Sequence, residues 1–387
     1  MRMLTKTPSE LTLPASGIAG KRARDPRLDV FRGIGMLIIL LAHVPNDPWA
    51  LWIPARFGFS DATEMFVFLS GMASAIAFGR LFDRKGFGLL TARVVHRCWQ
   101  IYWAHIAVFL TVATIMAAAG HKPDGTSYIQ SLNLVRFFQD PGPLLIGLMT
   151  LTYVPNYFDI LPMYMVILAL MPVMLIAERV VAWLPFFLMA ALWLSAQFGL
   201  AHLQAEPWSD RPWFFDPFGW QLIFFLGFFL MRGTVKLPVG SRKLLIASVA
   251  FVVVTVPFAW HVVLSASPFF REVAQAIGPL TSKTDFGILR LVHFLALAQI
   301  AMLVVGEKGA RLHHPAVRPL TAILIRVGQQ SLPVFMTGMV VAQLIGIALD
   351  HSGRGALAVA TANLAGFAIL VATAYVAAWF KRAPWTA

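Results

Sequence analysis

The chain has 387 residues, of which 58% are hydrophobic and only 13% are charged, and its mean hydropathy is +0.72. Soluble globular proteins are far less apolar, so this composition excludes a soluble domain and indicates a polytopic integral membrane protein. The formal net charge of +13 would suggest a nucleic-acid partner in a soluble protein. In a membrane protein, the positions of the basic residues instead indicate which segments are cytoplasmic, so no nucleic acid is expected as a partner. The single cysteine, Cys98, excludes an intramolecular disulfide and a cysteine-based metal site.

The N-terminal 24 residues differ from the rest of the chain. They are rich in Ser, Thr, Pro and basic residues, and they lack the apolar core and cleavage site of a signal peptide. We expect residues 1–24 to form a disordered cytoplasmic tail. Residues 25–387 contain no internal repeat and no domain linker, so we expect them to form a single membrane domain.

Ten apolar segments predict the membrane spans. A helix needs about 20 residues to cross a bilayer, and most of the segments approach this length. They cover residues 30–45, 62–82, 98–119, 158–177, 182–202, 218–231, 244–264, 286–305, 327–349 and 356–380. The predicted fold is therefore an all-α bundle of about ten transmembrane helices. A further apolar run within 134–154, LLIGLMTLTYV, is too short to cross, so we expect it to be re-entrant or interfacial.

The positions of the basic residues orient this bundle. Lys and Arg are enriched in the cytoplasmic segments of multispan proteins. If both termini are cytoplasmic, only eight of the 31 Lys and Arg residues lie on the outside. These eight are Arg56, Lys122, Arg136, Arg211, Arg271, Lys283, Arg290 and Arg354. The sequence thus predicts that both the N-terminus and the C-terminus are cytoplasmic.

The first predicted span carries two polar residues that point to chemistry. Arg32 and His43 are eleven positions apart, which on a helix is three turns and about 16 Å along one face. A histidine buried at the outer end of a span can accept a proton from an alcohol near neutral pH. The alternative is that His43 only caps the helix or bonds to a neighbouring helix.

Two carboxylates are candidates to orient His43. Glu64, near the start of the second span, comes level with His43 if the first two helices pack antiparallel. Asp47, four residues after His43, is the competing candidate, although Pro45 interrupts the helical spacing between them. Further along the second span, Gly71 is better explained by close helix packing than by chemistry.

A pair of arginines follows on the cytoplasmic side. Arg93 and Arg97 are four residues apart and share one helical face. Two convergent guanidinium groups match the oxygens of a phosphate-bearing ligand. The alternative is an anchor to lipid headgroups. Together with Arg32, the pair favours a phosphate site.

These residues resemble a known family. The segments RLDVFRGIGMLIILLAH, YFDILPMY, FDPFGWQLIFFLG, LRLVHFLALA and QSLPVF occur in this order over residues 25–340. The chain is similar to the OpgC family, within the acyltransferase type 3 superfamily. This resemblance implies succinyl transfer to osmoregulated periplasmic glucans in the bacterial inner membrane. It also implies that acyl-CoA is a donor substrate, with no tightly bound cofactor and no metal.

The same resemblance implies roles for several residues. His43 matches the essential histidine and would act as the general base, and Arg32 matches its arginine partner. Arg93 and Arg97 match arginines that receive the acyl-CoA phosphates. The catalytic set that we predict is His43 with Glu64 or Asp47, and the donor-binding set is Arg32, Arg93 and Arg97.

The acceptor is expected at the outer ends of later spans. Asp159 and Tyr164 flank a proline at a helix start and could bind sugar hydroxyls. The tryptophans Trp208, Trp213 and Trp220 could stack on sugar rings, or belong to the aromatic belt at the headgroup level. In the eighth span, Arg290 and His293 are candidates to line a cavity, with Arg290 contacting a succinyl carboxylate.

Other functions stay open at this point. An O-acetyltransferase of another envelope polysaccharide or of a lipid-linked sugar fits the same residues. A multispan transporter fits the span count, but no inverted repeat or pair of interrupted helices supports it. The sequence decides neither succinyl against acetyl, nor the acceptor sugar, nor a covalent acyl-histidine, nor the oligomeric state.

Overall fold

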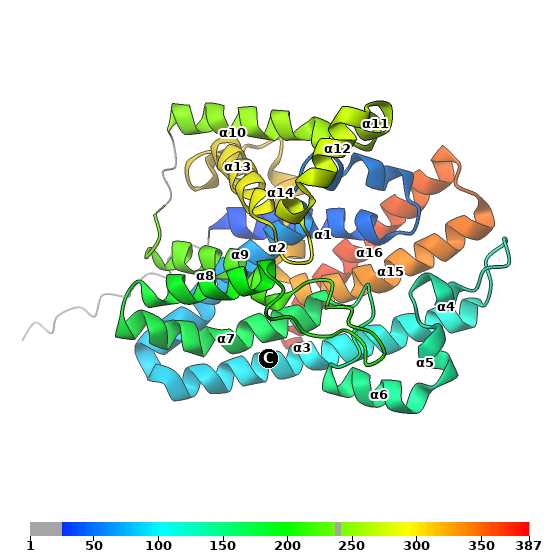
Figure 1. Ribbon diagram of the computed structural model, residues 1–387, viewed down its shortest axis with the longest axis horizontal. Helices are drawn as coiled ribbons and strands as arrows, with labels where there is room; N and C mark the ends of the chain where they lie inside the picture. The colour runs from blue at the N-terminus through cyan, green and yellow to red at the C-terminus, as the bar shows by residue number, and fades with distance from the viewer. Residues whose placement is uncertain (1–24, 237–240, 387) are drawn as a thin grey trace, which may run out of the picture.

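The computed structural model describes residues 25–236 and 241–386, which form a bundle of helices (Figure 1). No strand occurs within these two ranges, where only two isolated backbone bridges are found. The predicted N-terminal tail lies outside the described residues. The helices are α1 Pro26–His43, α2 Ala62–Ser74, α3 Arg80–Ala119, α4 Tyr128–Ser131, α5 Val135–Gln139, α6 Pro141–Thr150, α7 Ile160–Val180, α8 Leu184–Gln197, α9 Pro217–Arg232, α10 Arg242–Thr255, α11 His261–Ala266, α12 Pro268–Ala276, α13 Ile288–Val305, α14 Arg318–Gln329, α15 Ser331–Ser352 and α16 Ala356–Phe380.

Five helical stretches in the described part of the chain are long and apolar enough to cross a membrane. They are Ala62–Ala119, Ile160–Val180, Ile288–Val305, Ser331–Ser352 and Ala356–Phe380. The first contains α2, a π-helical turn at Ala75–Gly79 and α3, and it breaks at Gly86, where φ is 78°. It therefore holds the second and third predicted spans. The protein is a membrane protein of the all-α class, and the count of ten spans stays a prediction.

Two predicted spans have different limits in the structure. The segment predicted at 327–349 begins inside α14, and the chain leaves the helical conformation at Gln330 before α15. The segment predicted at 244–264 is not one helix: α10 ends at Thr255, a short 3-10 turn holds Pro257, and α11 begins at His261. Proline lacks an amide hydrogen and clashes with the preceding turn, which explains the second break.

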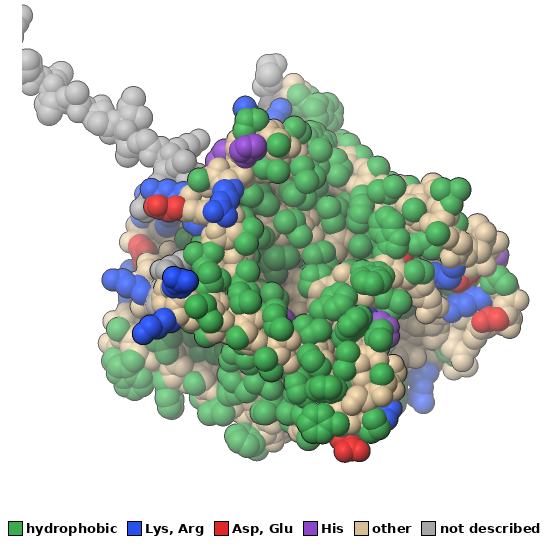
Figure 2. Space-filling view, turned by 90° about the horizontal axis from the view of Figure 1, so that it is seen from above, with side chains coloured by type: hydrophobic (Ala, Val, Ile, Leu, Met, Phe, Trp, Pro, Cys, Tyr) green, Lys and Arg blue, Asp and Glu red, His purple; other side chains and the backbone are tan. Residues whose placement is uncertain are grey.

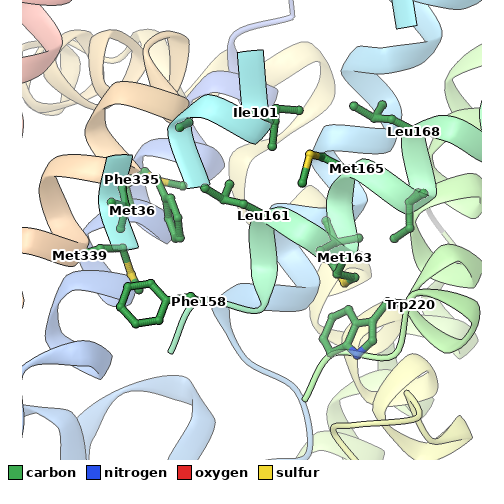
Figure 3. Packing of buried hydrophobic residues seen from close by; sticks show 14 of the residues in the cluster. Met36, Ile101, Phe158, Leu161, Met163, Met165, Leu168, Trp220, Phe335 and Met339 are labelled. Carbon is green, nitrogen blue, oxygen red and sulfur yellow. The ribbon is translucent and has the colours of Figure 1, made fainter. Parts of the chain in front are cut away.

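Apolar side chains fill the centre of the bundle. Met36 of α1, Ile101 of α3, Leu168 of α7, Trp220 of α9 and Met339 of α15 are all buried in one cluster (Figure 3). Seen from above, hydrophobic side chains cover most of the visible face, and Lys and Arg side chains lie toward its left and right edges (Figure 2). An apolar exterior with charge at its edge suits a bundle embedded in lipid.

Ion pairs join helix ends that the sequence places on the same side of the membrane. Arg232, at the end of α9, contacts Asp83 at 3.1 Å and Glu178 of α7 at 2.9 Å. The predicted topology places all three on the cytoplasmic side. At the opposite ends, Arg354 contacts Asp350 of the same helix end at 2.6 Å and donates to the Pro45 carbonyl, just after α1, at 2.8 Å. These contacts agree with the predicted alternation of spans, while the side that faces the cytoplasm stays a prediction.

Candidate active site

A cavity of about 290 Å³ lies at the C-terminal end of α1. Helix α1 contributes His43, the segment before α2 contributes Asp61, and the segment before α7 contributes Tyr157 and Asp159. Lys283 enters from the loop between α12 and α13. Aromatic side chains complete the wall, namely Phe66, Phe214, Phe215 and Phe335. Titratable groups from four separate segments thus meet around one space.

His43 is held in a defined tautomer. It is the last residue of α1, and its Nδ1 lies 2.7 Å from the carbonyl oxygen of Ile39, one turn earlier. A carbonyl only accepts hydrogen bonds, so Nδ1 must carry the hydrogen. In the neutral ring, Nε2 is then the nitrogen with a free lone pair. His43 is therefore prepared to accept a proton at Nε2.

Tyr157 packs against the His43 ring in a strained conformation. The two ring centroids are 5.3 Å apart in an edge arrangement. The backbone of Tyr157 has φ of 88°, which is rare for a bulky residue and costs free energy. Its hydroxyl donates a 2.6 Å hydrogen bond to the Met339 carbonyl of α15, which fixes the side chain. Strain of this kind gathers at functional sites, and no sequence pattern indicates it here.

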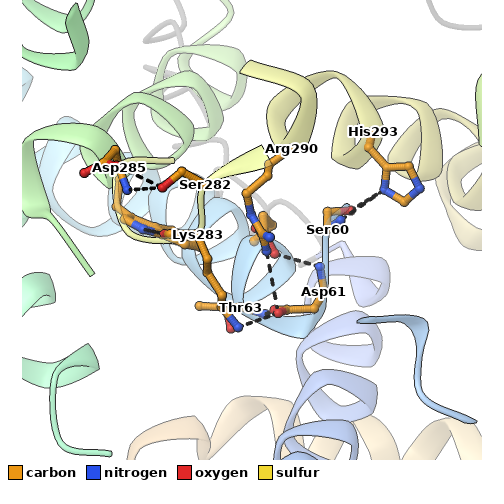
Figure 4. A network of polar contacts seen from close by, with 10 residues as sticks. Ser60, Asp61, Thr63, Ser282, Lys283, Asp285, Arg290 and His293 are labelled. Carbon is orange, nitrogen blue, oxygen red and sulfur yellow. Dashed lines mark hydrogen bonds and ion pairs between the residues drawn. The ribbon is translucent and has the colours of Figure 1, made fainter. Parts of the chain in front are cut away.

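Four charged groups form a network beside the cavity (Figure 4). The Nζ of Lys283 lies 2.5 Å from Asp61 Oδ2, and a guanidinium nitrogen of Arg290 lies 3.6 Å from the same oxygen. Arg290 also donates to Glu64 Oε1 at 2.5 Å and 2.6 Å. Burial raises the pKa of Asp61, but the cations Lys283 and Arg290 lower it more, so it lies well below the ordinary carboxyl range. Asp61 therefore stays ionised at neutral pH.

The loop that carries Lys283 is fixed through its backbone. Side chains of α8 and α9 and the backbone at the start of α9 bond to it. Trp220 Nε1 donates to Lys283 O at 2.8 Å, Trp193 Nε1 to Phe286 O at 2.8 Å, Gln197 Nε2 to Asp285 O at 2.5 Å, and the Asp216 amide to Thr284 O at 3.0 Å. Because four backbone carbonyls are held, the direction in which Lys283 leaves the loop is set by the bundle.

A second contact positions the segment before α2. The amide and the hydroxyl of Ser60 both approach Nδ1 of His293, at 3.3 Å and 2.7 Å, and both can donate to it. Gly58 lies so close to the His293 ring that a Cβ there would be 2.1 Å from Nε2. His293 is buried in α13, so it fixes the segment that presents Asp61 and does not line the His43 cavity.

Neither Glu64 nor Asp47, the two carboxylates predicted to orient His43, is bonded to it in the structure. Glu64 belongs to a capping box in which its side chain accepts from the Asp61 amide at 2.7 Å, and Arg290 binds its other oxygen. Asp47 caps the short turn after α1 by accepting from the Trp49 amide at 3.0 Å. Each carboxylate already satisfies backbone donors at a helix start, which directs it away from the histidine.

The predicted donor arginines lie on two different helices. Arg32 of α1 donates to the Leu69 carbonyl of α2 at 3.1 Å. On α3, Arg93 is exposed, and Arg97 donates to Gln100 one turn later at 3.0 Å. The structure thus leaves Arg93 accessible to a ligand from the surface, and it tests no phosphate role.

The predicted acceptor residues divide into two groups. Asp159 lines the cavity, where it accepts a 3.0 Å bond from the Phe214 amide. Tyr164 lies one turn into α7 and packs edge-on against Phe224 at 5.9 Å. Trp220 is completely buried and holds the loop of Lys283, so the expected stacking on sugar rings is wrong for this residue.

The other two tryptophans give no open stacking platform either. Trp213 is buried, with Nε1 donating to the Gln204 carbonyl at 3.0 Å. Trp208 packs beneath the guanidinium of Arg136, which is 4.8 Å from the ring centroid. Arg290 lines a neighbouring cavity of about 170 Å³ and is bound to Glu64, and it does not line the His43 cavity.

An apolar groove of about 390 Å³ runs between α1, α2 and α13. One end reaches Asp25 and Arg27 at the start of α1, and the other reaches Ser60 and Asp61. The residues between are almost entirely aliphatic, aromatic or Met. Asp61 lines both the groove and the His43 cavity, as do Ile38 and Ala62, so the two spaces are adjacent.

Comparison with known proteins decides the family. A family model described as OpgC protein matches residues 24–382, nearly the whole chain. The chain belongs to the OpgC family. Its membership indicates an OpgC-type acyltransferase, as the resemblance suggested. No curated protein and no solved structure matched the chain. The place of the family in the acyltransferase type 3 superfamily stays a prediction.

For this OpgC-family chain, sequence reasoning found His43 and Asp159 but did not single out three other residues of the cavity, namely Asp61, Tyr157 and Lys283. The sequence marks Lys283 only as an outer basic residue, and Tyr157 only as part of a matching segment. The one signal available for Lys283 was that it is a lysine in an outer segment between two predicted spans, where basic residues are few. Among the described residues, no group of three or more His, Cys, Asp or Glu side chains is placed to hold a metal.

Proposed function

We propose that the protein transfers a succinyl group from cytoplasmic acyl-CoA to hydroxyl groups of osmoregulated periplasmic glucans. The observation that carries this proposal is the tautomer of His43, whose Nδ1 hydrogen is held by the Ile39 carbonyl at the wall of a cavity. Membership of the OpgC family supports acyl transfer as the reaction class. An inner-membrane location follows from a cytoplasmic donor and a periplasmic acceptor.

The reaction can proceed by direct transfer. His43 Nε2 accepts the proton of an acceptor hydroxyl, whose oxygen attacks the thioester carbonyl carbon. The tetrahedral intermediate then loses the sulfur, which takes the proton back from the imidazolium. The products are an ester and the free thiol of CoA. No covalent enzyme intermediate is required for this sequence of bonds.

The donor would approach from the cytoplasmic ends of the helices. Arg32, Arg93 and Arg97 are proposed to contact its phosphates, because guanidinium groups match phosphate oxygens. The apolar groove offers the thioester arm a path from Arg27 toward Asp61. At Asp61 the groove meets the cavity of His43, where the acceptor hydroxyl would be activated.

The acceptor would enter the cavity from the periplasm. Asp159 and Asp61 provide carboxylate oxygens at the cavity wall, and these can accept hydrogen bonds from sugar hydroxyls. The aromatic wall, including Phe214 and Phe215, provides apolar surface for the faces of sugar rings. A mixture of aromatic surface and a few convergent polar groups is typical of ligand sites.

The decisive experiment is mass spectrometry of periplasmic glucans. A strain without the gene should lack a succinyl mass increment, and the wild-type gene should restore it. The His43→Ala variant should reduce the increment by at least about 10²-fold, because it removes the general base. His121→Ala is the matched control, since His121 is exposed beyond the end of α3. An acetyl increment would favour the O-acetyltransferase alternative, and glucans that do not change with the gene would contradict the proposal.

A further inference from the structure

The His43 cavity contains one cationic side chain. Of the described residues that line it, Lys283 alone is a Lys or Arg. Its side chain is 32% exposed and lines the cavity, where the ammonium group contacts Asp61. The ammonium also lies 5.6 Å from the centroid of the Phe215 ring, which lines the same space. A small anion that enters the cavity would therefore meet Lys283.

Asp61 can release Lys283 without losing all charge compensation. In the structure Asp61 Oδ2 contacts Lys283 at 2.5 Å and Arg290 at 3.6 Å. If Lys283 turns toward a ligand carboxylate, Arg290 still faces Asp61. A buried carboxylate with no cation nearby would oppose this exchange strongly, so the second cation makes the exchange feasible.

Arg290 itself is not available to a ligand in the cavity. Its side chain is only 9% exposed, and both its Nε and a terminal nitrogen bond to Glu64, whose side chain is completely buried. Removing Arg290 from Glu64 would leave that carboxylate buried and unpaired. Of the two cations in the network, only Lys283 lines the cavity and can exchange its carboxylate partner for an anionic substrate group.

We propose that Lys283 binds the free carboxylate of a dicarboxylic acyl donor and so selects a succinyl group over neutral acyl groups. This inference rests on the proposed function, because it concerns the acyl group that reaches His43. The contact would be a charge-assisted hydrogen bond from Nζ to a carboxylate oxygen of the donor. The fixed loop backbone around Lys283 would hold constant the point from which its side chain extends toward the donor.

The test measures donor preference with purified protein in lipid. We would compare kcat/KM for succinyl-CoA and for butyryl-CoA, which has the same chain length and no terminal carboxylate. In the wild type, succinyl-CoA should be preferred. In Lys283→Met the ratio of the two values should fall by about 10- to 100-fold, as expected for loss of a charged hydrogen bond. Because both donors are measured on one preparation, a smaller folded fraction cancels in the ratio.

Two further variants make the result specific. Lys283→Arg keeps the cation and should retain a preference for succinyl-CoA. Lys122→Met removes a lysine from the segment after α3, outside the cavity, and should leave the ratio unchanged. An unchanged ratio in Lys283→Met, or equal loss of turnover with both donors, would overturn the selective role. A wild type that does not use succinyl-CoA would instead refute the proposed function.

Discussion

At the scale of single residues, the tautomer of His43 depends on its place at the end of a helix. The ring reaches the carbonyl oxygen of Ile39 in the preceding turn. A backbone acceptor of this kind can replace the carboxylate that orients the histidine in many hydrolases. Glu64 is predicted as a partner from an antiparallel packing of the first two spans, and Asp47 from its position four residues after His43, yet both carboxylates cap helix starts.

Contacts between residues far apart in the chain are the part of the site that could not be predicted from the sequence. The interval between Arg32 and His43 is local, so helical geometry alone relates them. The contact between Asp61 and Lys283 joins residues 222 positions apart. Nothing in a single sequence relates such positions, because the contact depends on how α2, α9 and α13 pack. The spacing therefore indicated His43 but not the cation beside it.

The proposed phosphate role of Arg93 and Arg97 can be tested directly. The double variant Arg93→Ala with Arg97→Ala should weaken binding of acyl-CoA by roughly tenfold or more, because charged hydrogen bonds to phosphate are lost. Isothermal titration calorimetry with the protein in nanodiscs gives the dissociation constant. Arg84→Ala with Lys85→Ala removes the same charge from exposed residues before the Gly86 break and serves as the control. Equal dissociation constants for the two double variants would return Arg93 and Arg97 to the role of lipid anchors.

At the scale of elements, two close helix crossings determine where the site residues lie. Helix α2 packs on α9, and α1 packs on α14. A Cβ on Gly71 would be 1.9 Å from the Phe224 carbonyl oxygen, and a Cβ on Gly227 would be 2.4 Å from the Phe68 carbonyl oxygen. The prediction that Gly71 serves close packing is thus confirmed. Small residues permit such contact between membrane helices, where lipid gives no hydrophobic drive for association.

The crossing of α2 and α9 should be sensitive to one methyl group. Gly71→Ala forces the two backbones apart, and we expect it to lower the free energy of unfolding by about 1–3 kcal/mol. Thermal unfolding in a mild detergent would show this as a lower Tm. Gly88→Ala is the matched control, since a Cβ at this position would meet no atom within 4 Å and alanine favours a helix. A Tm for Gly71→Ala equal to that of Gly88→Ala would contradict this account of the crossing.

The sequence predicted the long helices better than the short ones. Apolar runs near span length, such as those of α7 and α16, coincide with helices in the structure. By contrast, the short helix α11 begins inside the run predicted at 244–264 as one span, and the short helix α12 lies outside every predicted run. Their ends depend on local features, such as the proline at the start of α12, and on packing that a hydropathy pattern does not contain.

At the scale of the whole molecule, the proposed reaction requires that the two ends of the bundle face different compartments. Arg232 with Asp83 and Glu178 marks one end, and Lys283 with Asp61 belongs to the other in the predicted topology. The charge distribution predicts that the first of these ends is cytoplasmic. Donor and acceptor would then reach His43 from opposite sides of the membrane.

Labelling of single cysteines tests this orientation. In a Cys98→Ser background, Asp210→Cys should react with a membrane-impermeant maleimide in intact spheroplasts. Lys85→Cys should react only after the membrane is disrupted. Both positions are exposed in the structure, so accessibility of the thiol does not differ between them. The reversed pattern would place the termini outside and would contradict a cytoplasmic donor site.

The loop of Lys283 is held through its main chain, and this bears on how the acyl group used by related enzymes can diverge. Its partners Trp220, Trp193 and Gln197 bond to main-chain oxygens and not to the side chain at position 283. A different side chain could therefore be introduced there while these bonds persist. If Lys283 selects the acyl group as proposed, one codon change at this position would alter the donor that an enzyme accepts, with little loss of fold stability.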